Sequence, residues 1–540
     1  SEFASPDRLK TISNFSGSAG FAIILKKENF LFVDGRYTLQ AQMQSGNYYK
    51  IIEIPKFSLR NTLKKYKKKL QLGFDPQLFT SSLIKRNFDD IFNLLPIEEN
   101  FIDKIYKEKN KNFVNSFYSL NIKVTGESIN SKINRLISKI KSNNIENIFI
   151  SSPENVAWLL NLRGRDNPNS PIPNCKIILT DKKKIYFFSC PKKINQIKKN
   201  KQYKNLIFCT YKDFSKVIYK LKGKNFCIDN LTCSISNESI ISKSFRIKLK
   251  TDPCYMMKSI KNKIEIKHTR DAHFKDGLAL TKFIFWIKNI NQKKITEIEA
   301  KNKLEKFRRL NKDYLFPSFD TIAGTGSNGA IIHYRVNKKS NKVIKKNDIF
   351  LCDSGGQYNY GTTDVTRTIC FSEQKKSIKD AFTNVLKGHI AVAQTNLNKI
   401  NTGKKIDASA RKFLNRDGLD YAHGTGHGVG FFLNVHEGPQ SISKYNSVKI
   451  KEGMILSNEP GYYKKGYYGI RIENLVYVKK NKKNLQFENL TLAPIEAKLI
   501  NYKLLSKSEK DYLFKYHLTI YSMYYKFLNM KERKWLASLI

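Results

Sequence analysis

The sequence lacks the features that mark several classes of protein. No run of about 20 apolar residues, the length of a membrane span, is present. The longest apolar stretch, residues 277–290, is interrupted by Lys282 and Lys288. The 8 cysteines form no Cys-x-x-Cys pair and no tight framework, which indicates reduced thiols rather than a disulfide scaffold. No internal repeat and no signal peptide are apparent. The chain starts at Ser1 rather than Met, so we expect that an upstream segment, which could carry a targeting signal, has been removed.

Acidic residues are also scarce, with 46 Asp and Glu against 97 Lys and Arg and a formal net charge of +51. Such a balance raises the question of nucleic acid. However, Lys outnumbers Arg and is spread along the chain together with abundant Ile and Asn, whose codons are also A/T-rich, so genome composition is a sufficient explanation. The basic runs at 63–70 and 192–204 are interpreted as solvated faces. We expect neither a nucleic-acid nor a membrane partner, although the charge favours anionic ligands at long range.

Length and periodicity predict a mixed α/β protein of two or three domains. A chain of 540 residues exceeds a single hydrophobic core, and 41% apolar residues are typical of a folded protein. Apolar residues at helical spacing over 129–140 precede a predicted strand at 147–151 and a predicted helix at 153–162. A polar stretch around 100–120 indicates a linker.

The character of the chain changes after a basic stretch at 245–262. Two long helices are predicted, one from about 262 and the other over 296–310, followed by a glycine-punctuated block of β-like runs over 317–480. The tail at 504–528 opens with a Ser-x-x-Glu-like cap and is predicted to be helical. Its many aromatic side chains require burial against the body or a partner subunit.

Histidines are few, and three of the 8 fall within one short segment, as His423 and His427 of HGTGHGVG (423–430) and His436. The spacing of the first two matches metal-binding helices, but each helical glycine would cost roughly 1 kcal/mol relative to alanine. The glycines instead let the backbone pass close to a ligand. The partners of any metal must therefore come from elsewhere in the chain.

Four carboxylates surround this segment in sequence: Asp353, Asp364, Glu459 and Glu473. Individually, each can be interpreted as a turn residue or a strand surface charge. Asp364 and Glu473, however, occur in runs typical of β-sheet, and Arg471 is expected on the same strand face as Glu473. Carboxylates inside strands are costly unless a cation compensates them. Four carboxylates and one imidazole suit two divalent ions, and oxygen-rich ligation favours Mn²⁺ or a similar ion.

Five motifs in this order give the chain a family resemblance: SFDTIAGTGSNGAIIHY (318–334), DSGGQYNYGTTDVTRT, HGTGHGVG, NEPGYY and GIRIEN. Together they resemble the catalytic domain of aminopeptidase P (Xaa-Pro aminopeptidase), a pita-bread metallopeptidase. FSGSAGFAI with LFVDGRYTLQA, and VAWLLNLRGRD, resemble its two N-terminal domains. The tail is similar to the C-terminal extension of the three-domain cytosolic type.

The resemblance implies two α/β N-terminal domains (1–115 and 116–255) and a pita-bread catalytic domain (256–540) with a C-terminal helical extension from about 485. The first strand of domain I is expected to be missing. A homodimer through the C-terminal part and a cytoplasmic location are implied, with an organellar location left open.

The resemblance also implies roles for individual residues. The metal ligands would be Asp353, Asp364, His427, Glu459 and Glu473, holding two divalent ions, first of all Mn²⁺ with Zn²⁺ or Co²⁺ as alternatives. The residues that handle the substrate would be His333, His423, His436 and Tyr463, with Phe319 and His423 as candidate walls of a proline pocket. Arg471 would support the ligand carboxylates.

The implied reaction releases the N-terminal residue from peptides with proline at the second position. A metal-bridging hydroxide would attack the carbonyl before proline, with Glu459 moving the proton and His436 donating to the oxyanion. One alternative is a prolidase that cuts only Xaa-Pro dipeptides, and another is a non-catalytic pita-bread binding module. A methionine aminopeptidase is disfavoured by the two additional N-terminal domains.

Overall fold

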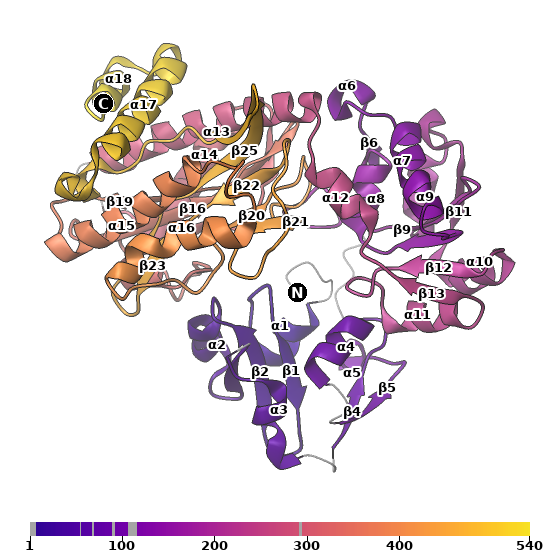
Figure 1. The fold of residues 1–540 in the computed structure, drawn as a ribbon. Helices are drawn as coiled ribbons and strands as arrows, with labels where there is room; N and C mark the ends of the chain where they lie inside the picture. Colours follow the sequence, from indigo (N-terminus) through magenta and orange to yellow (C-terminus); the bar gives the residue numbers. More distant parts are fainter. Residues whose placement is uncertain (1–6, 55, 67–69, 89–91, 106–115, 291–293) are drawn as a thin grey trace. The chain divides into compact units, whose positions relative to one another are not determined.

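A computed structural model describes the chain except for residues 1–6, 55, 67–69, 89–91, 106–115 and 291–293. It divides into two compact units, Ser1–Lys258 and Ser259–Ile540 (Figure 1). Residues 106–115 of the expected linker, which include the expected boundary at residue 115, lie outside the described residues, as do the first six residues of expected domain I.

The first part of unit 1 is built on a three-stranded sheet in the order β1-β2-β3. Strand β2 (Asn29–Asp34) pairs antiparallel with β1 (Phe21–Ile24) and parallel with β3 (Lys50–Ile54), and helix α2 (Thr38–Ser45) makes the crossover. The middle of β2 is buried on both faces, with Phe30 and Phe32 in one core cluster and Leu31 and Val33 in another. A two-stranded parallel sheet, β4 (Gln71–Phe74) with β5 (Asn93–Pro96), follows.

A mixed six-stranded sheet forms the second part of unit 1. Its order is β11 (Leu206–Cys209), β10 (Ile185–Phe188), β9 (Lys176–Thr180), β7 (Asn147–Ile150), β12 (Asn225–Ile228) and β13 (Arg246–Leu249). Helices pack beside it, namely α7 (Ile129–Lys141), α8 (Pro153–Leu159), α10 (Phe214–Lys220) and α11 (Ile235–Ser242). The predicted helix–strand–helix order is confirmed, although α8 ends at Leu159, earlier than expected.

Long helices frame unit 2. Helix α13 (Lys263–Asn289) packs on α14 (Glu297–Arg309), and α15 (Lys376–Ala393) packs on α16 (Gly403–Arg416). The predicted helices after 262 and at 296–310 are confirmed, and reciprocal capping boxes fix their starts, Asn262 with Glu265 and Thr296 with Glu299.

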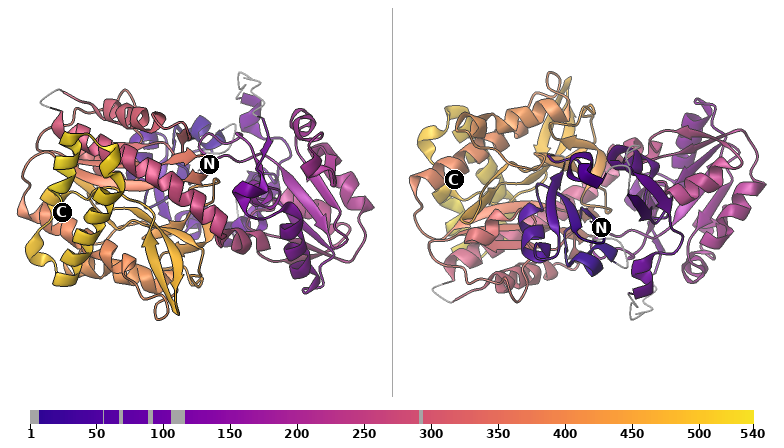
Figure 2. Two further views of the ribbon diagram at one scale, coloured as in Figure 1. Left: turned by 90° about the horizontal axis from the view of Figure 1, so that it is seen from above. Right: turned by 90° about the horizontal axis from the view of Figure 1, so that it is seen from below.

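Antiparallel sheets lie between these helix pairs (Figure 2). One runs β15 (Ile322–Thr325), β16 (Ile349–Ser354), β19 (Val365–Cys370); a second runs β21 (Glu437–Ile442), β20 (Gly426–Gly428), β22 (Ile455–Asn458), β25 (Asn474–Asn481), β26 (Asn484–Asn489). Smaller sheets are β14 (Tyr314–Pro317) with β17 (Gly356–Tyr358) and β18 (Gly361–Thr362), and β23 (Gly461–Lys464) with β24 (Tyr468–Arg471).

The two faces of β16 and β19 differ in chemistry. Phe350, Cys352 and Ile369 belong to the core cluster that contains the apolar side chains of α13 and α14. Because side chains alternate along a strand, Asp353 and its cross-strand partner Thr366 lie on the opposite face. That face carries the candidate site.

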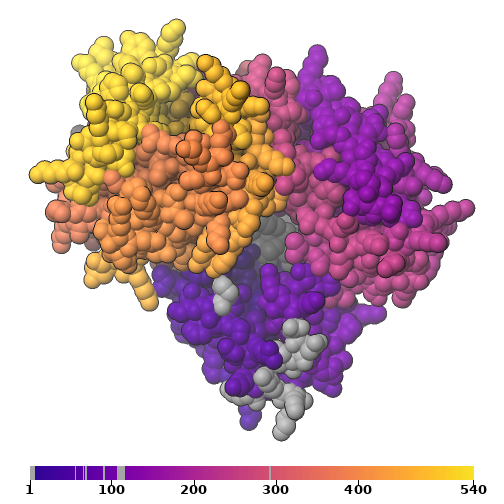
Figure 3. All heavy atoms as spheres, viewed as in Figure 1, coloured from indigo at the N-terminus to yellow at the C-terminus, as the bar shows by residue number. Residues whose placement is uncertain are grey.

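The C-terminal extension consists of α17 (Lys507–Tyr524) and α18 (Met530–Ala537), with Ser506 and Glu509 forming the predicted cap. It lies at the surface of unit 2, beside α13 (Figures 2 and 3). Tyr516 and Tyr524 are buried, whereas Phe514 and Phe527 stay half exposed, so the expected burial of the aromatic tail is only partial within one chain. No helix among the described residues is both long and apolar enough to cross a membrane.

Removing one partner of the buried ion pair between α13 and α14 will destabilise the protein. Asp276 accepts from Arg308 at 2.7 Å and from the Tyr358 hydroxyl at 2.8 Å, and the two charged side chains are 3% and 1% exposed. Asp276→Ala leaves the guanidinium buried without its countercharge, so we expect the free energy of unfolding in urea to fall by about 3–5 kcal/mol. Lys376→Ala, at the exposed pair with Asp380, should change it by less than about 1 kcal/mol. Equal effects of the two substitutions would contradict the assignment.

Candidate active site

Four carboxylates converge where the two larger sheets of unit 2 meet. Asp353 lies in β16, Asp364 immediately precedes β19, Glu459 immediately follows β22, and Glu473 immediately precedes β25. One ligand atom each of Asp364, His427 and Glu473 lies within 4.8 Å of the others. Segments more than 100 residues apart in sequence are thus brought together.

Two local predictions were wrong. Asp364 and Glu473 lie between strands rather than inside them, and Arg471 and Glu473 do not share a strand, because β24 ends at Arg471 and β25 begins at Asn474. The amide of Ile472 donates to Pro460 O at 3.3 Å, in register with the last β23–β24 pair, whereas the amide of Glu473 donates to Thr366 O of β19 at 3.2 Å. The break lets the chain pass from one sheet to another at the site.

Arg471 and Glu473 nevertheless meet at one hydroxyl. Thr366 Oγ1 donates to Glu473 Oε2 at 2.8 Å and accepts from Arg471 Nε at 3.1 Å. Arg471 Nη2 also donates to Asp353 Oδ2 at 2.5 Å. The buried guanidinium therefore orients two of the candidate ligands.

His427 turns Nε2 of its ring toward the carboxylates. It lies in β20, so the exclusion of a helix is confirmed. Its Nδ1 donates to Gly428 O at 2.9 Å, which leaves the lone pair on Nε2. Nε2 is 3.4 Å from both Asp364 Oδ2 and Glu459 Oε1. This tautomer is the one that a metal-ligating histidine needs.

The carboxylates are crowded and buried beyond what their protein neighbours compensate. Burial, and after it the neighbouring Asp353, raises the pKa of Asp364 well above its usual range. Burial followed by Asp364 does the same to the pKa of Glu473, and burial raises the pKa of Glu459. Only one of these carboxylates has an arginine hydrogen bond in the described residues, the bond from Arg471 to Asp353.

The donor set fits divalent cations. Asp353 Oδ1 and Glu473 Oε1 are buried and find no hydrogen-bond partner within the described part of the chain. Buried carboxylate oxygens of this kind are costly without a cation. The site contains no thiolate, because the adjacent Cys352 faces the opposite side of β16. Oxygen donors with a single imidazole suit ions such as Mn²⁺ or Mg²⁺.

His423, Tyr463 and Arg471 form a hydrogen-bonded series beside the carboxylates. Arg471 Nη1 donates to the Tyr463 hydroxyl at 2.6 Å, which donates to His423 Nε2 at 2.8 Å. His423 Nδ1 donates to Gly424 O at 2.8 Å. His423 therefore faces a phenol rather than the carboxylates, which agrees with its interpretation as a non-ligand.

The remaining predicted residues lie around this group. The exposed His436 ring is 4.3 Å from the ring of His427. His333 is half-buried in the segment after the short helix Gly326–Ala330, and Phe319 is half-buried in the turn after β14. Neither belongs to the group of ligand atoms within 4.8 Å. Tyr334, next to His333, donates to the fully buried Glu297 at 2.9 Å, which anchors that segment.

Several supporting residues were not predicted from the sequence. Besides Thr366, they are Ser457, whose hydroxyl donates to Glu459 Oε1 at 3.0 Å, and the pair Asp407–Arg411 on α16. Asp407 Oδ1 accepts from Thr425 Oγ1, and Arg411 Nη2 donates to His423 O, both at 2.6 Å. An Asp and an Arg four apart on a helix is a visible signal, but such pairs usually lie on a solvated face.

Models of known protein families match almost the whole chain. Two Creatinase/Prolidase N-terminal domain models match residues 3–101 and 108–265, the model of metallopeptidase family M24 matches 267–480, and that of the C-terminal region of peptidase M24 matches 483–539. Fold and site thus define a metallopeptidase of family M24 with two creatinase-type N-terminal domains.

Individual relatives narrow this class. The chain is 37% identical to a probable Xaa-Pro aminopeptidase P of Laccaria bicolor, over 94% of this chain and 83% of that protein. It is 35% identical to Xaa-Pro aminopeptidase 1 of Dictyostelium discoideum, over 99% and 90%. The chain belongs to the Xaa-Pro aminopeptidase P family, which confirms the resemblance stated from the motifs.

Solved structures agree. A crystal structure of an X-prolyl aminopeptidase from Caenorhabditis elegans, described as a cytosolic enzyme with a di-nuclear active site, superposes with a TM-score of 0.92 at 30% identity, covering 100% of this chain and 92% of that one. A prolidase from Pyrococcus furiosus superposes with a TM-score of 0.53 at 25% identity, covering 66% of this chain and 99% of that one. The predicted pita-bread architecture with α/β N-terminal domains is confirmed.

Divalent cations will stabilise the protein increasingly as pH rises. Without a cation, Asp364 and Glu473 have pKa values raised by burial above those of the unfolded chain, so the folded state binds more protons. Stability is then lost as pH rises through the window above about 4. A cation binds the ionised carboxylates and reverses this loss. We expect the thermal midpoint with Mn²⁺ to exceed that in EDTA, with a gap that widens from pH 5 to pH 8.

The difference between the thermal midpoints with Mn²⁺ and with EDTA depends on the affinity of the protein for Mn²⁺. At 100 times the dissociation constant, binding at one site stabilises the protein by about 2.7 kcal/mol. Since groups away from the site contribute equally in both samples, the difference between the two midpoints isolates the site. Identical midpoints with Mn²⁺ and with EDTA across this range would contradict the assigned ligands.

Proposed function

We propose that this protein is a metal-dependent aminopeptidase that releases the N-terminal residue from peptides with proline at the second position. The observation that carries the proposal is the convergence of three buried carboxylates, those of Asp353, Asp364 and Glu473, and the half-buried Glu459 with Nε2 of His427. Relatives that match this chain over nearly its whole length are named Xaa-Pro aminopeptidases.

Five residues would hold two divalent ions. Asp353 would bind one ion, His427 and Glu459 the other, and Asp364 and Glu473 would bridge them. Mn²⁺ is the first candidate, with Zn²⁺ or Co²⁺ as alternatives. When bound, the ions supply a nucleophile at neutral pH, polarise the scissile carbonyl and anchor the free α-amine, which limits cleavage to one residue.

Glu459 is the proposed proton carrier. It lies at the end of β22 with one oxygen held by the Ser457 hydroxyl at 3.0 Å. In the metal-free site, burial raises the pKa of the Glu459 carboxyl above its ordinary value, and in the loaded site an ionised Glu459 can accept a proton as a general base. We assign it the transfer of a proton from the attacking water to the imino nitrogen of the leaving proline.

The histidines and aromatic residues handle the peptide. His436, exposed beside His427, is positioned to donate to the developing oxyanion, and His333 and His423 would orient the substrate. Tyr463 would reach the substrate, while Arg471 holds Tyr463 and Asp353 in place. The bond before proline lacks an N–H group, and the proline ring fixes φ, so an apolar pocket with walls at Phe319 and His423 can recognise it.

The alternatives are weaker. The Pyrococcus prolidase superposes on about two thirds of this chain, whereas the nematode X-prolyl aminopeptidase superposes on all of it. A non-catalytic binding module is disfavoured because all five ligand positions are filled.

Domain limits, assembly and location belong to the same proposal. We propose domain I at 1–115, domain II at 116–255 and the catalytic domain at 256–540, with the extension from about 485. A homodimer through the C-terminal part is supported by apolar side chains on α17 that remain exposed, Phe514 at 49% and Leu518 at 41%. A cytoplasmic location is proposed, as described for the nematode enzyme.

Substrate length separates the proposed activity from its main alternative. With Mn²⁺, the protein should hydrolyse the first bond of Xaa-Pro-Pro tripeptides, as measured by release of the free N-terminal amino acid. Longer peptides should also be cleaved, because a pocket that binds the proline at the second position does not limit the length of the peptide after that residue. Hydrolysis confined to Xaa-Pro dipeptides would establish a prolidase instead.

Glu459→Ala should lower kcat by at least about 10²-fold, because it removes the proton carrier together with a metal ligand. The fold should be unchanged, as judged by circular dichroism and thermal unfolding in EDTA. Glu452→Ala is a matched control, since Glu452 is an exposed residue before β22 and should retain wild-type kcat. Near-normal turnover of Glu459→Ala would refute the assigned role.

A further inference from the structure

Arg367 in β19 is a fully buried guanidinium whose hydrogen bonds all go to uncharged groups. It is 1% exposed. Its donors reach Thr366 O, Glu473 O, Asn474 Oδ1, Ala493 O, Pro494 O and the Tyr516 hydroxyl, at distances from 2.7 to 2.9 Å. A buried cation costs several kcal/mol unless its surroundings compensate it. A residue retained only for packing would not need this charge.

The position of Arg367 relative to the candidate ligands explains the charge. Thr366 and Arg367 are successive residues of a strand, so their side chains lie on opposite faces. Thr366 Oγ1 donates to Glu473 Oε2 at 2.8 Å, and Arg367 Nη1 donates to Glu473 O at 2.7 Å. With the amide of Glu473 donating to Thr366 O at 3.2 Å, β19 holds both the side chain and the backbone of one proposed bridging ligand.

The other side of the same guanidinium is bound by the C-terminal extension. Ala493 O and Pro494 O belong to the segment after β26, and Tyr516 belongs to α17. The Tyr516 hydroxyl lies 3.0 Å from Ala493 O and 3.2 Å from Thr491 O, so it fixes that segment as well. Arg367 therefore connects α17 to Glu473 through one planar group.

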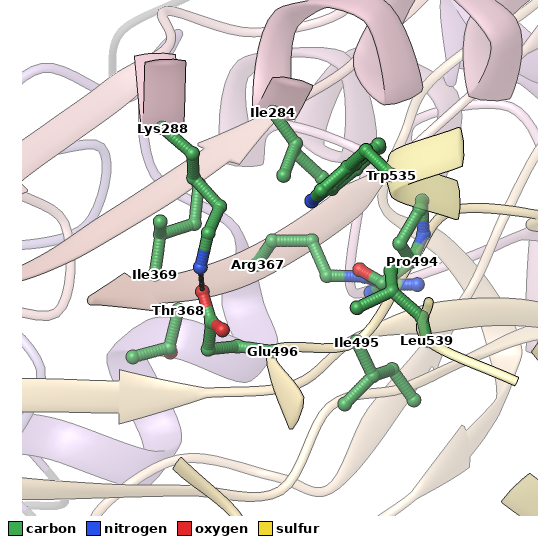
Figure 4. A pocket seen from close by; sticks show the side chains of 10 residues that line it. All are labelled: Ile284, Lys288, Arg367, Thr368, Ile369, Pro494, Ile495, Glu496, Trp535 and Leu539. Carbon is green, nitrogen blue, oxygen red and sulfur yellow. Dashed lines mark hydrogen bonds and ion pairs between the residues drawn. The ribbon is translucent and has the colours of Figure 1, made fainter. Parts of the chain in front are cut away.

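The surroundings of Arg367 are nearly dry. Figure 4 shows its side chain beside a small cavity, with Trp535 and Leu539 of the C-terminal end among the lining residues. The cavity measures about 20 Å³, which accommodates about one water molecule. With so little water nearby, the hydrogen bonds of Arg367 are strong, and water cannot readily take their place when the guanidinium is removed.

We propose that Arg367 is a positioning residue of the metal centre, and that through it the C-terminal extension sets the place of Glu473. The inference rests on the proposed role of Glu473 as a metal ligand. It gives the buried side of the C-terminal extension a role in metal binding, whereas the exposed side of α17 is the one proposed for the homodimer. A guanidinium that fixes the backbone of a ligand from outside the coordination sphere should act on metal affinity before it acts on chemistry.

The test is titration of Mn²⁺ into metal-free full-length protein, followed by calorimetry. Arg367→Lys keeps the charge but cannot reach all the acceptors, and we expect Mn²⁺ affinity to fall by about 10- to 100-fold, the range for residues that orient metal ligands. Tyr516→Phe removes one acceptor and should lower affinity by a smaller factor. The visible absorption of Co²⁺ bound to each variant should shift, because the geometry at Glu473 changes.

Lys288→Met is the matched control. Lys288 lines the same cavity and pairs with Glu496 at the base of the extension, but its bonds go to Glu496 and Cys370 O rather than to Glu473 (Figure 4). It should retain wild-type Mn²⁺ affinity and the wild-type Co²⁺ spectrum. If Arg367→Lys fails to fold, the test is the Mn²⁺ affinity of Tyr516→Phe compared with that of Lys288→Met.

The outcomes separate the inference from the function on which it rests. Wild-type protein that binds no Mn²⁺ overturns the proposed function. Wild-type protein that binds two Mn²⁺ while the Arg367 and Tyr516 variants bind them equally well overturns the inference alone. An equal loss in Lys288→Met and Tyr516→Phe also overturns it, since it would show a general loosening of the junction.

Discussion

Mutual repulsion among four carboxylates is the constraint around which unit 2 is arranged. Burial raises the pKa values of Asp364, Glu459 and Glu473, and Arg471 is the one arginine in the described part of the chain that hydrogen-bonds a carboxylate of the cluster. Two buried carboxylate oxygens lack a partner in the described residues. Such a cluster persists only if the surrounding sheets hold it, or if cations complete it. The antiparallel sheets and flanking helix pairs provide the first condition, and the donor set invites the second.

Strand alternation is what allows the site to be both charged and stable. On β19, Thr366 and Thr368 face Glu473 and Arg471, and they hydrogen-bond Glu473 Oε2 and Arg471 O. Val365 and Ile369 face the core made with α13 and α14, and Arg367 lies among them. One strand thus separates a polar face, which carries the candidate site, from an apolar face. The cationic Arg367 is the exception on the apolar face, and it hydrogen-bonds Glu473 O.

The sequence predicted which residues form the candidate site better than it predicted the strand boundaries and contacts that position them. Helices with capping signals, such as those starting after Asn262 and Thr296, could be placed because the signal lies within four residues. The converging carboxylates could be named because five ordered motifs carry a family resemblance. The break between Arg471 and Asn474 could not, because β-forming residues lie directly on both sides of it with no turn residue between them, and only pairing with different sheets ends the strand. The roles of Asp407, Arg411 and Arg367 depend on contacts across more than one element, which no local pattern reveals.

The glycine-rich segment 423–430 shows how one backbone device gives two histidines different chemistry. His423 and His427 each donate Nδ1 to the carbonyl of the following glycine, at 2.8 and 2.9 Å. Both rings therefore direct Nε2 outward, toward different partners: the Tyr463 hydroxyl for His423 and two carboxylates for His427. Gly426 between them is required for another reason, since a Cβ there would lie 1.9 Å from Ser457 O. That close approach brings β20 against β22, and so brings His427 to within 3.4 Å of Glu459. The four-residue spacing that suggests a helical pair of ligands instead places one histidine against two carboxylates and the other against a tyrosine.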